Sequence, residues 1–309
     1  MPPSTPPARG RERRPGRRPR RRQEPRSHLP RRRGGGAARP RHQGRGHTGT
    51  LDPMATGVVV LLVGRATRLA RFMTHDLKAY EAAVTFGRAT DTYDAEGATT
   101  GETGRWPDET ALAQALATAA AAREQVPPAY SAKKVDGEVA YKAARRDAPL
   151  ALPPVPVTVH DLTLRGYADG VATLSLTVSS GFYVRSLAHD LGVLTGTGAH
   201  LSALRRVRAG AFDLTGALTF EALKAAPRGG LRDQVRPIET LLPDLRGVPL
   251  TDDLARRIRH GQTVQIGGAA DVAGAPVRLL DPAGRLLAIA RATPVGSSGL
   301  SLQPLVVLG

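Results

Sequence analysis

The chain has 309 residues, a formal net charge of +17 and no cysteine. This length can form one large domain and one small one. The lack of cysteine excludes disulfides, thiolate metal sites and cysteine nucleophiles. The longest apolar run, Val58 to Val63, is too short to span a bilayer, and the N-terminus does not resemble a secretory signal. We therefore expect a soluble, cytoplasmic protein.

Most of the positive charge lies in an N-terminal tail. Residues 1–46 contain 16 Arg and two Glu, a net charge of +14, which leaves only +3 for the rest of the chain. Rich in Pro and Gly and nearly free of large apolar side chains, residues 1–45 are predicted to be disordered. Such a tail could bind phosphates non-specifically or have no evolved role. It lacks the amphipathic, Ser-rich pattern of a mitochondrial transit peptide.

The first predicted elements after the tail are a helix and a strand. Residues 66–75 place Leu69, Phe72 and Met73 on one helical face. In residues 80–86, a tyrosine, an alanine, a valine and a phenylalanine alternate with more polar or smaller neighbours, which is typical of a half-buried strand.

The central part of the chain continues with a helix, a predicted strand pair and another helix. Asp108 is a candidate N-cap for the first of these helices, and Ala168-Asp169-Gly170 is a turn between the two strands. The predicted ranges are a helix at 108–123, strands at 157–165 and 171–179, and a helix at 183–194.

The pattern changes near Thr251, where a short helix precedes several short strands. The hairpin signal Asp281-Pro282-Ala283-Gly284 joins the last two strands. The predicted ranges are a helix at 251–260 and strands at 263–266, 277–280 and 286–290. A small β-rich domain is therefore expected to begin near residue 248.

The residues of the body limit the chemistry that is possible. Scattered histidines, with no HxxxH, paired-carboxylate or GxxxxGK[ST] spacing, argue against a metal centre and against nucleotide hydrolysis. A single carboxylate remains the candidate, namely Asp52 in GHTGTLDPMATG (46–57). It needs a partner that sets its ionisation, and Arg185, Tyr80 and Tyr183 are candidates. In isolation, an Asp-Pro pair more often only shapes a turn.

Five ordered stretches carry a resemblance to a known family. They are GHTGTLDPMATGVVVLLVGRATRLARFM, KAYEAAVTFGRATDTYDAEG, PPAYSAKKVDGEVAYKAAR, SSGFYVRSLAHDLG and GTGAHLSALRRVRAG. Their order and spacing, from about Gly46 to Gly210, resemble the TruB family of tRNA pseudouridine-55 synthases. The C-terminal segment resembles the family's PUA-like RNA-binding domain more loosely.

The resemblance implies a fold, a domain organisation and an activity. The fold is α+β: a mixed, mostly antiparallel central sheet with flanking helices, followed by a small PUA-like β domain. A pseudouridine synthase domain at 46–247 and a PUA-like domain at 248–309 would follow the tail. The activity is isomerisation of uridine 55 in the tRNA T-loop to pseudouridine. It requires no redox cofactor, metal or nucleotide.

The resemblance also assigns roles to single residues. Asp52 matches the catalytic aspartate, which acts as nucleophile or base while the base detaches and reattaches. Small neighbours and a turn would let a flipped-out nucleotide approach it closely. Arg185 matches the arginine that pairs with this aspartate. Tyr80 matches the tyrosine that stacks on the target base and helps to remove its C5 proton. Tyr183 matches a pocket tyrosine near the pair.

Two further matches complete the expected site. His47 matches the histidine that keeps the target uridine extruded, and Leu204 matches an apolar pocket wall. Each of these residues also has an ordinary interpretation: a solvated loop histidine for His47 and plain core packing for Leu204 and the two tyrosines. For Arg185 the ordinary interpretation is a surface salt bridge.

The expected partner is the T-arm and elbow of tRNA, bound by a monomer with no obligatory protein partner. Basic residues of the body are candidates for contacts with the RNA backbone, although each alone would more often be a solvated surface charge. They are Arg65, Arg68, Arg88, Lys133, Lys134, Lys142, Arg205 and Arg206.

The N-terminus departs from the family pattern. Family members open with a strand and a helix that carry a KPxGxTS-like motif, and the basic tail occupies that place here. We hypothesise that residues 1 to about 44 are a frameshifted or mis-started translation, which resequencing of the 5′ region would test. A genuine tail would leave the central sheet with an exposed edge and an uncovered apolar face.

Two alternatives to a free-standing enzyme stay open. A non-catalytic tRNA-binding or tRNA-folding protein would bind tRNA without forming product. A relative that works inside a guide-RNA particle, as related archaeal and eukaryotic enzymes do, would need partner proteins and guide RNA, although the body follows the stand-alone bacterial pattern.

Overall fold

The computed structural model describes residues 44–73, 77–135, 137–146, 148, 150–227, 229–267, 274–296 and 299–309, and each structural statement below concerns these residues. The predicted disordered tail lies outside them, apart from its last two positions. Gly44 precedes the first strand, which begins at Arg45. No helix among the described residues is long and apolar enough to cross a membrane.

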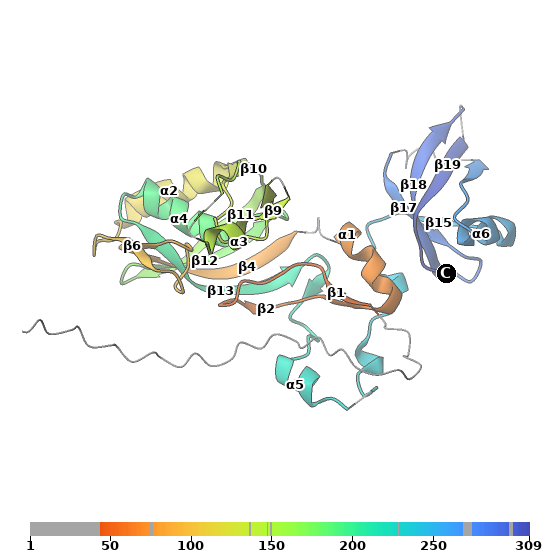
Figure 1. Cartoon of the computed structure of the whole chain (residues 1–309), viewed down its shortest axis with the longest axis horizontal. Coiled ribbons are helices and arrows are strands. Elements are labelled where there is room, and N and C mark those ends of the chain that lie inside the picture. The colour runs from red at the N-terminus through yellow and green to blue at the C-terminus, as the bar shows by residue number, and fades with distance from the viewer. Residues whose placement is uncertain are drawn as a thin grey trace, which may run out of the picture. The chain divides into compact units, whose positions relative to one another are not determined.

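A six-stranded sheet is the centre of the structure (Figure 1). Its strand order is β11-β12-β4-β13-β14, and β2 pairs with β13 in parallel while all other pairs are antiparallel. The strands are β2 (Thr56–Gly57), β4 (Lys78–Phe86), β11 (Val159–Ala168), β12 (Val171–Val178), β13 (Ala199–Ala209) and β14 (Phe212–Asp213). The mixed, mostly antiparallel sheet predicted from the sequence is confirmed.

The sheet forms where the sequence alternates. In β4 the side chains of Tyr80, Ala82, Val84 and Phe86 are buried in one core, and the intervening residues face the other way. The β11–β12 pair is closed by Asp169 and Gly170, whose φ values are +50° and +72°. Two consecutive left-handed residues match the right-handed twist of a hairpin, so the predicted turn forms as expected.

Helices α2 (Glu109–Ala121) and α4 (Val184–Leu194) pack against this inward face. The N-cap predicted at Asp108 is present, because its carboxylate accepts a hydrogen bond of 2.8 Å from the Ala111 N–H. The apolar face of α4 includes Leu187 and Leu191, both buried in the same core. The sheet and α4 are the two rigid elements that carry the residues considered below.

Short strand pairs lie outside the six-stranded sheet. Pairs β5–β6, β7–β10 and β8–β9 are two-stranded and antiparallel, and α3 follows the last of them. Their bounds are β5 (Arg88–Thr90), β6 (Thr99–Glu102), β7 (Glu124–Gln125), β8 (Lys134–Val135), β9 (Glu138–Val139), α3 (Ala140–Ala144) and β10 (Val155–Pro156).

The N-terminal part of the described chain is a hairpin and a helical turn. Strand β1 (Arg45–His47) pairs with β3 (Leu61–Val63), and η1 (Gly64–Leu69) and α1 (Ala70–Met73) follow. The helix predicted at 66–75 thus begins as a 3₁₀ helix. There the hydroxyl of Thr67 bonds to the Gly64 carbonyl at 2.7 Å, a local bond that competes with α-helical pairing.

One face of residues 58–63 is buried and the other is not. Val58, Val60 and Leu62 lie in a second core, whereas Val59, Leu61 and Val63 are 43%, 55% and 43% exposed. Large apolar side chains on both faces are typical of a strand covered on both sides. These three side chains form an exposed apolar row on the outer face of residues 59–63.

The chain then leads to a second sheet through α5 (Phe220–Ala225), η2 (Arg232–Gln234) and η3 (Ile238–Thr240). This sheet has the order β15-β17-β18-β19-β16, and α6 packs on it with Thr251 as N-cap. The bounds are β15 (Gly247–Pro249), α6 (Asp252–Arg259), β16 (Val264–Gly267), β17 (Pro276–Leu280), β18 (Leu286–Val295) and β19 (Gly299–Val307). The α+β class with a small β-rich C-terminal part is confirmed, and the residue boundaries of the domains stay predictions.

Asp190 on α4 gives the fold a pH dependence. Its carboxyl lies beside the apolar lining of a cavity of about 280 Å³, and burial raises its pKa from 3.8 to about 6. Because the folded state favours the neutral acid, the stabilisation is complete below about pH 4 and is lost as the pH rises through 6. We expect Asp190→Asn to unfold at a higher temperature than the wild type at pH 8 and at the same temperature at pH 4.

Thermal unfolding followed by circular dichroism across this pH range measures the difference. The matched control is Asp244→Asn, which replaces an exposed aspartate. An Asp190→Asn curve parallel to that of the wild type at every pH would contradict the assignment. The effect should be modest, since residue 190 is partly exposed to solvent, which screens its charge.

Candidate functional site

The loop that carries Asp52 is fixed at both ends. It follows β1, closes a turn in which the Ala55 N–H donates to the Asp52 carbonyl at 2.9 Å, and enters β2 beside β13. Pro53 occupies the second position of this turn, which its fixed φ favours. Gly57 has φ +101°, and a Cβ there would lie 2.1 Å from the Arg206 carbonyl oxygen. Only glycine fits this contact, so the small residues keep the loop pressed against β13.

The carboxylate of Asp52 forms a two-point ion pair with Arg185 at the start of α4. Arg185 Nε donates to Asp52 Oδ2 at 2.9 Å and Nη2 donates to Oδ1 at 2.8 Å. The Arg185 side chain is only 6% exposed, whereas that of Asp52 is 30% exposed. A bidentate pair fixes both the position and the plane of the carboxylate. Asp52 is thus held rigidly while part of it stays open to solvent.

Arg185 uses its remaining N–H groups on two other segments. Nη1 donates to the Thr92 carbonyl at 3.1 Å and lies 3.7 Å from Asp94 Oδ2, and Nη2 donates to the Tyr130 carbonyl at 3.0 Å. All sides of the guanidinium therefore have partners. One buried cation joins the loop of Asp52 to two loops that are distant in sequence.

Asp94 is the second carboxylate of this network. It is 5% exposed, and its Oδ1 accepts hydrogen bonds from the Thr92 hydroxyl at 2.6 Å and from the Glu96 N–H at 3.1 Å. A buried carboxylate is stable when it is paired and hydrogen-bonded, as this one is. Sequence reasoning assigned no role to Asp94, although an acidic residue inside the stretch DTYDAEG was the available signal.

The loop around Asp94 has an uncommon backbone conformation at Tyr93, and ring stacking helps to hold it. Tyr93 has φ +64°, an uncommon conformation for a residue with a large side chain. Its ring stacks on His189 of α4, with centroids 3.9 Å apart and an interplanar angle of 12°. The Tyr93 carbonyl also accepts from the Leu201 N–H at 2.9 Å. These contacts attach the loop to both α4 and β13.

Tyr80 lies on β4 next to the ion pair. Its side chain is buried, and burial raises the pKa of its hydroxyl, with the nearby charge of Asp52 acting in the same direction. The nearby Arg206 guanidinium opposes this rise in pKa. The phenol is therefore neutral at physiological pH, and it lies within electrostatic range of Asp52.

Tyr183 occupies the N-cap position of α4. Its N–H donates to Gln125 Oε1 at 2.8 Å, and its carbonyl accepts from Gln125 Nε2 at 3.0 Å. Burial raises the pKa of the Tyr183 hydroxyl, and the nearby Arg185 guanidinium opposes the shift. Gln125 is buried and anchors the start of the helix that carries Arg185.

The six residues assigned from the sequence differ in their placement. Asp52, Arg185, Tyr80 and Tyr183 gather at one place, as the mutual electrostatic effects show. Leu204 is 7% exposed and belongs to the central core, opposite Ala82 on β4. His47 is exposed on β1, opposite Leu61, and the structure does not bring it into contact with the ion pair.

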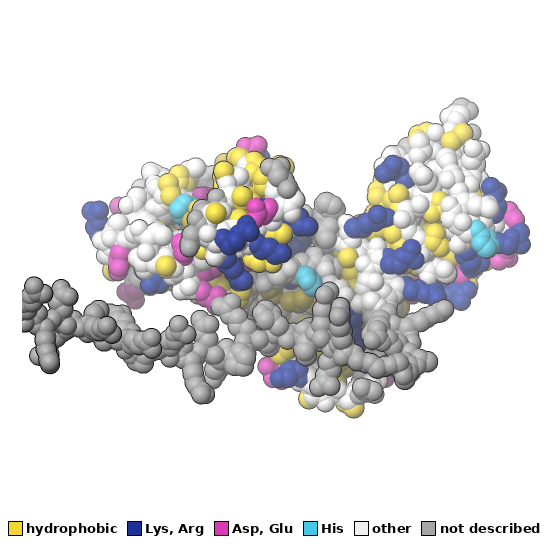
Figure 2. Space-filling model, in the orientation of Figure 1, with side chains coloured by type: hydrophobic (Ala, Val, Ile, Leu, Met, Phe, Trp, Pro, Cys, Tyr) yellow, Lys and Arg dark blue, Asp and Glu magenta, His cyan; other side chains and the backbone are white. Residues whose placement is uncertain are grey.

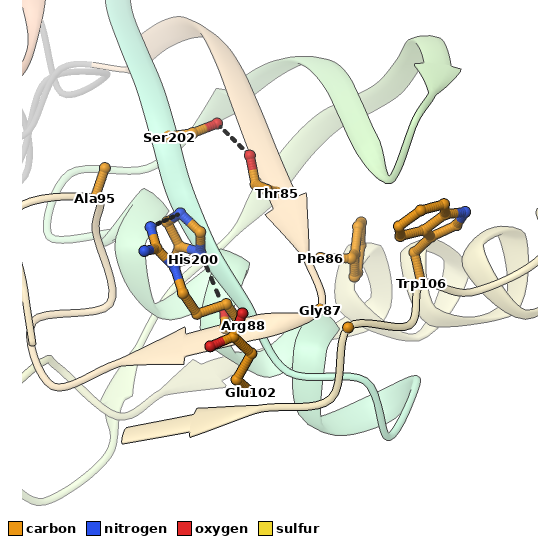
Figure 3. A pocket seen from close by; sticks show the side chains of 10 residues that line it. Thr85, Phe86, Gly87, Arg88, Ala95, Glu102, Trp106, His200 and Ser202 are labelled. Carbon is orange, nitrogen blue, oxygen red and sulfur yellow. Dashed lines mark hydrogen bonds between the residues drawn. The ribbon is translucent and has the colours of Figure 1, made fainter. Parts of the chain in front are cut away.

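A separate pocket of about 480 Å³ lies where β4 and β13 meet β5 and β6 (Figure 3). His200 is buried there and donates from Nδ1 to the Arg88 carbonyl at 3.0 Å, while its Nε2 accepts from Arg88 Nη2 at 3.2 Å. Both ring nitrogens of His200 thus form hydrogen bonds that join β13 to β5. Within the described chain, no group of three or more His, Cys, Asp or Glu side chains is arranged to hold a metal ion.

Comparisons with known proteins agree with this geometry. A family model described as "TruB family pseudouridylate synthase (N terminal domain)" matches residues 41–184, and "tRNA pseudouridylate synthase B C-terminal domain" matches residues 185–243. The chain belongs to the TruB family of pseudouridylate synthases. Asp52 lies within the first match, and Arg185 is the first residue of the second.

Curated relatives cover most of the chain. The protein "tRNA pseudouridine synthase B" of Solibacter usitatus (strain Ellin6076) is 43% identical over 70% of this chain and 75% of its own length. The protein of the same name from Burkholderia mallei (strain NCTC 10247) is 39% identical over 85% of this chain and 88% of its own. These likenesses confirm the family membership suggested by the motifs.

Solved structures confirm the fold. A chain in "Crystal Structure of a Cbf5-Nop10-Gar1 Complex" matches with a TM-score of 0.65 and 22% identity, over 86% of this chain and 77% of that one. A chain in "Structure of H/ACA RNP bound to a substrate RNA containing 2'-deoxyuridine" matches with a TM-score of 0.63 and 20% identity, over 86% and 77%.

Several basic residues of this TruB family member form hydrogen bonds within the protein. Arg65 and Arg68 donate to the carbonyls of Leu308 and Val307, and Arg88 bonds to the buried His200. Arg206 is 2% exposed, so the expectation that it contacts an RNA backbone is wrong. Lys133, Lys134 and Lys142 are exposed on and beside β8 and α3. Figure 2 shows Lys and Arg side chains gathered over that region.

The Arg185 network predicts a large effect of a single substitution. Arg185→Gln leaves Asp94 buried without a cation, so we expect the free energy of unfolding to fall by about 3 kcal/mol or more. Adding Asp94→Asn should recover part of that loss, because the uncompensated charge is then removed. Urea denaturation measures both effects.

The matched control for this prediction is Arg256→Gln, which removes an exposed i,i+3 pair with Asp253 and should change little. Equal midpoints for Arg185→Gln and Arg256→Gln would refute the view that Arg185 is a buried structural joint. A double variant less stable than Arg185→Gln would contradict the coupling to Asp94.

Proposed function

We propose that this protein isomerises uridine 55 in the T-loop of tRNA to pseudouridine. The observation that carries the proposal is a carboxylate, Asp52, oriented by a buried guanidinium and left partly open to solvent. The curated relatives, 39–43% identical, bear the name tRNA pseudouridine synthase B. An oriented, partly exposed carboxylate is suited to react with a nucleotide that has flipped out of its base stack.

The reaction exchanges one bond to ribose for another. The bond between N1 of uracil and C1′ breaks, the ring turns, C5 bonds to C1′, and the C5 proton is lost while N1 gains one. Asp52 is proposed to act as nucleophile or base in this sequence, by attacking the sugar, attacking the base or removing a ribose proton. Each role requires an ionised carboxylate, and pairing with Arg185 favours that form.

The neighbouring residues are proposed to hold the base while it is detached. Tyr80 would stack on the uracil ring and help to remove the C5 proton, and Tyr183 and Leu204 would complete the pocket wall. His47 would keep the uridine extruded from the T-loop. Its exposed place on β1 fits a residue that meets RNA at the edge of the site. Flipping costs least for a base in a loop.

Docking of tRNA is proposed to use two surfaces of a monomer. Exposed lysines on and beside β8 and α3 would contact the RNA backbone. The C-terminal sheet with α6 would act as a PUA-like RNA-binding module, and α6 ends in the basic residues Arg256, Arg257 and Arg259. The chemistry needs no cofactor, and no protein partner is proposed.

Substitution of Asp52 by asparagine tests the proposal. The amide keeps the size of the side chain but cannot act as a nucleophile or a base, so we expect loss of turnover with tRNA affinity largely retained. Tritium release from tRNA labelled at uridine C5 measures turnover, and filter binding measures affinity. A transcript with cytidine at position 55 controls for the target.

The outcomes separate the alternatives. Tritium release by the wild type alone supports the free-standing enzyme. Binding without release by the wild type would favour a tRNA-binding or tRNA-folding protein. Release only after partner proteins and guide RNA are added would favour a guide-RNA particle. Parallel loss of binding and turnover in Asp52→Asn would indicate that Asp52 is structural.

A further inference from the structure

Arg206 is a buried cation beside the site for which the family resemblance supplies no role. Arg206 is 2% exposed, although the neighbouring residue on the same strand, Arg205, is exposed. Taking a guanidinium out of water is costly unless its donors find acceptors. The acceptors of Arg206 therefore indicate which parts of the structure the buried guanidinium holds.

These acceptors belong to the loop of Asp52. Arg206 Nε donates to the Val58 carbonyl at 2.7 Å, Nη2 to the Gly49 carbonyl at 3.1 Å and Nη1 to the Thr50 carbonyl at 3.5 Å. The Val58 N–H donates back to the Arg206 carbonyl at 2.8 Å. One side chain thus clamps the loop on both sides of Asp52, two and three residues before it and six after it.

Arg206 also lies beside Tyr80. The two residues are direct partners in the β13–β4 register, and both side chains are buried. Arg206 therefore connects the loop of Asp52 to the strand pair that carries Tyr80.

Strand alternation explains why one arginine is buried and its neighbour is not. Successive side chains of a strand point to opposite faces, and the β13–β4 register runs without a shift from Arg205 to Arg206. Arg205 faces the other side of the sheet, where its side chain is 54% exposed and 3.9 Å from Glu81.

We propose that Arg206 is a positioning residue of the isomerase: it holds the Asp52 loop in place against β13, beside Tyr80, without touching the RNA. This inference rests on the proposed function for its consequence in catalysis. Its structural part, the clamp on the loop, stands on the hydrogen bonds alone. A misplacement of the order of 1 Å at a reacting group can lower a rate by about a hundredfold.

The experiment compares Arg206→Lys in the full chain with the matched control Arg208→Lys, which changes an exposed arginine on the same strand. Lysine keeps the charge, but one ammonium cannot reach the carbonyls of Val58, Gly49 and Thr50 together. We expect Arg206→Lys to lower the single-turnover rate of pseudouridine formation on the order of a hundredfold, with the tRNA dissociation constant within about threefold of the wild type. The control should match the wild type in both.

A second measurement does not depend on activity. Hydrogen exchange of peptides that cover residues 46–57 should be faster in Arg206→Lys than in the wild type, while peptides from α2 and the C-terminal sheet should exchange unchanged. Arg208→Lys should exchange like the wild type throughout. This separates a local release of the loop from global destabilisation.

The outcomes decide between the explanations. Unchanged exchange in residues 46–57 would overturn the clamp, whether or not the wild type is active. Faster exchange everywhere would mean a general core residue, and a loss of tRNA affinity matching the loss of rate would mean an RNA contact; either overturns the proposal. A wild type inactive on tRNA, with the loop still released in Arg206→Lys, would refute the proposed function and leave the clamp intact.

Discussion

The guanidinium of Arg185 is the constraint on which the site depends. It is buried at the first turn of α4 and bonds to Asp52, to the Thr92 carbonyl and to the Tyr130 carbonyl, and Asp94 lies beside it. Three loops therefore share one cation. Without the guanidinium, Asp52 would lose its bidentate partner and the buried Asp94 its only nearby cation among the described residues, which is costly for a buried charge.

Strand β13 provides the second half of the arrangement. The Asp52 loop pairs with it through β2, and the loop around Tyr93 bonds to it at Leu201. Two loops that are about forty residues apart in sequence thus meet on the same edge of one strand, facing α4. The close contact at Gly57 and the left-handed backbone of Tyr93 are local costs of this meeting.

The charges of the site are graded by exposure. Arg185, Asp94 and Arg206 are buried and have their partners inside the protein, whereas Asp52 is the one member of this group that is substantially open to solvent. Buried ion pairs contribute little net stability compared with apolar packing, but they specify geometry, since each polar atom must find its partner. The buried charged residues thus fix the geometry of the site, and Asp52 is the carboxylate among them that solvent can reach.

The sequence by itself determined the alternating strands, the helix around the Asp108 cap, the hairpin at Asp169 and Gly170 and the motif that contains Asp52, because these depend on local periodicity and turn chemistry. It also indicated Arg185 and the two tyrosines as partners. Only the tertiary structure decided that Asp94 completes the network, that Arg206 faces inward and that His47 stays exposed. These depend on contacts between segments that are distant in sequence, and no local pattern records them.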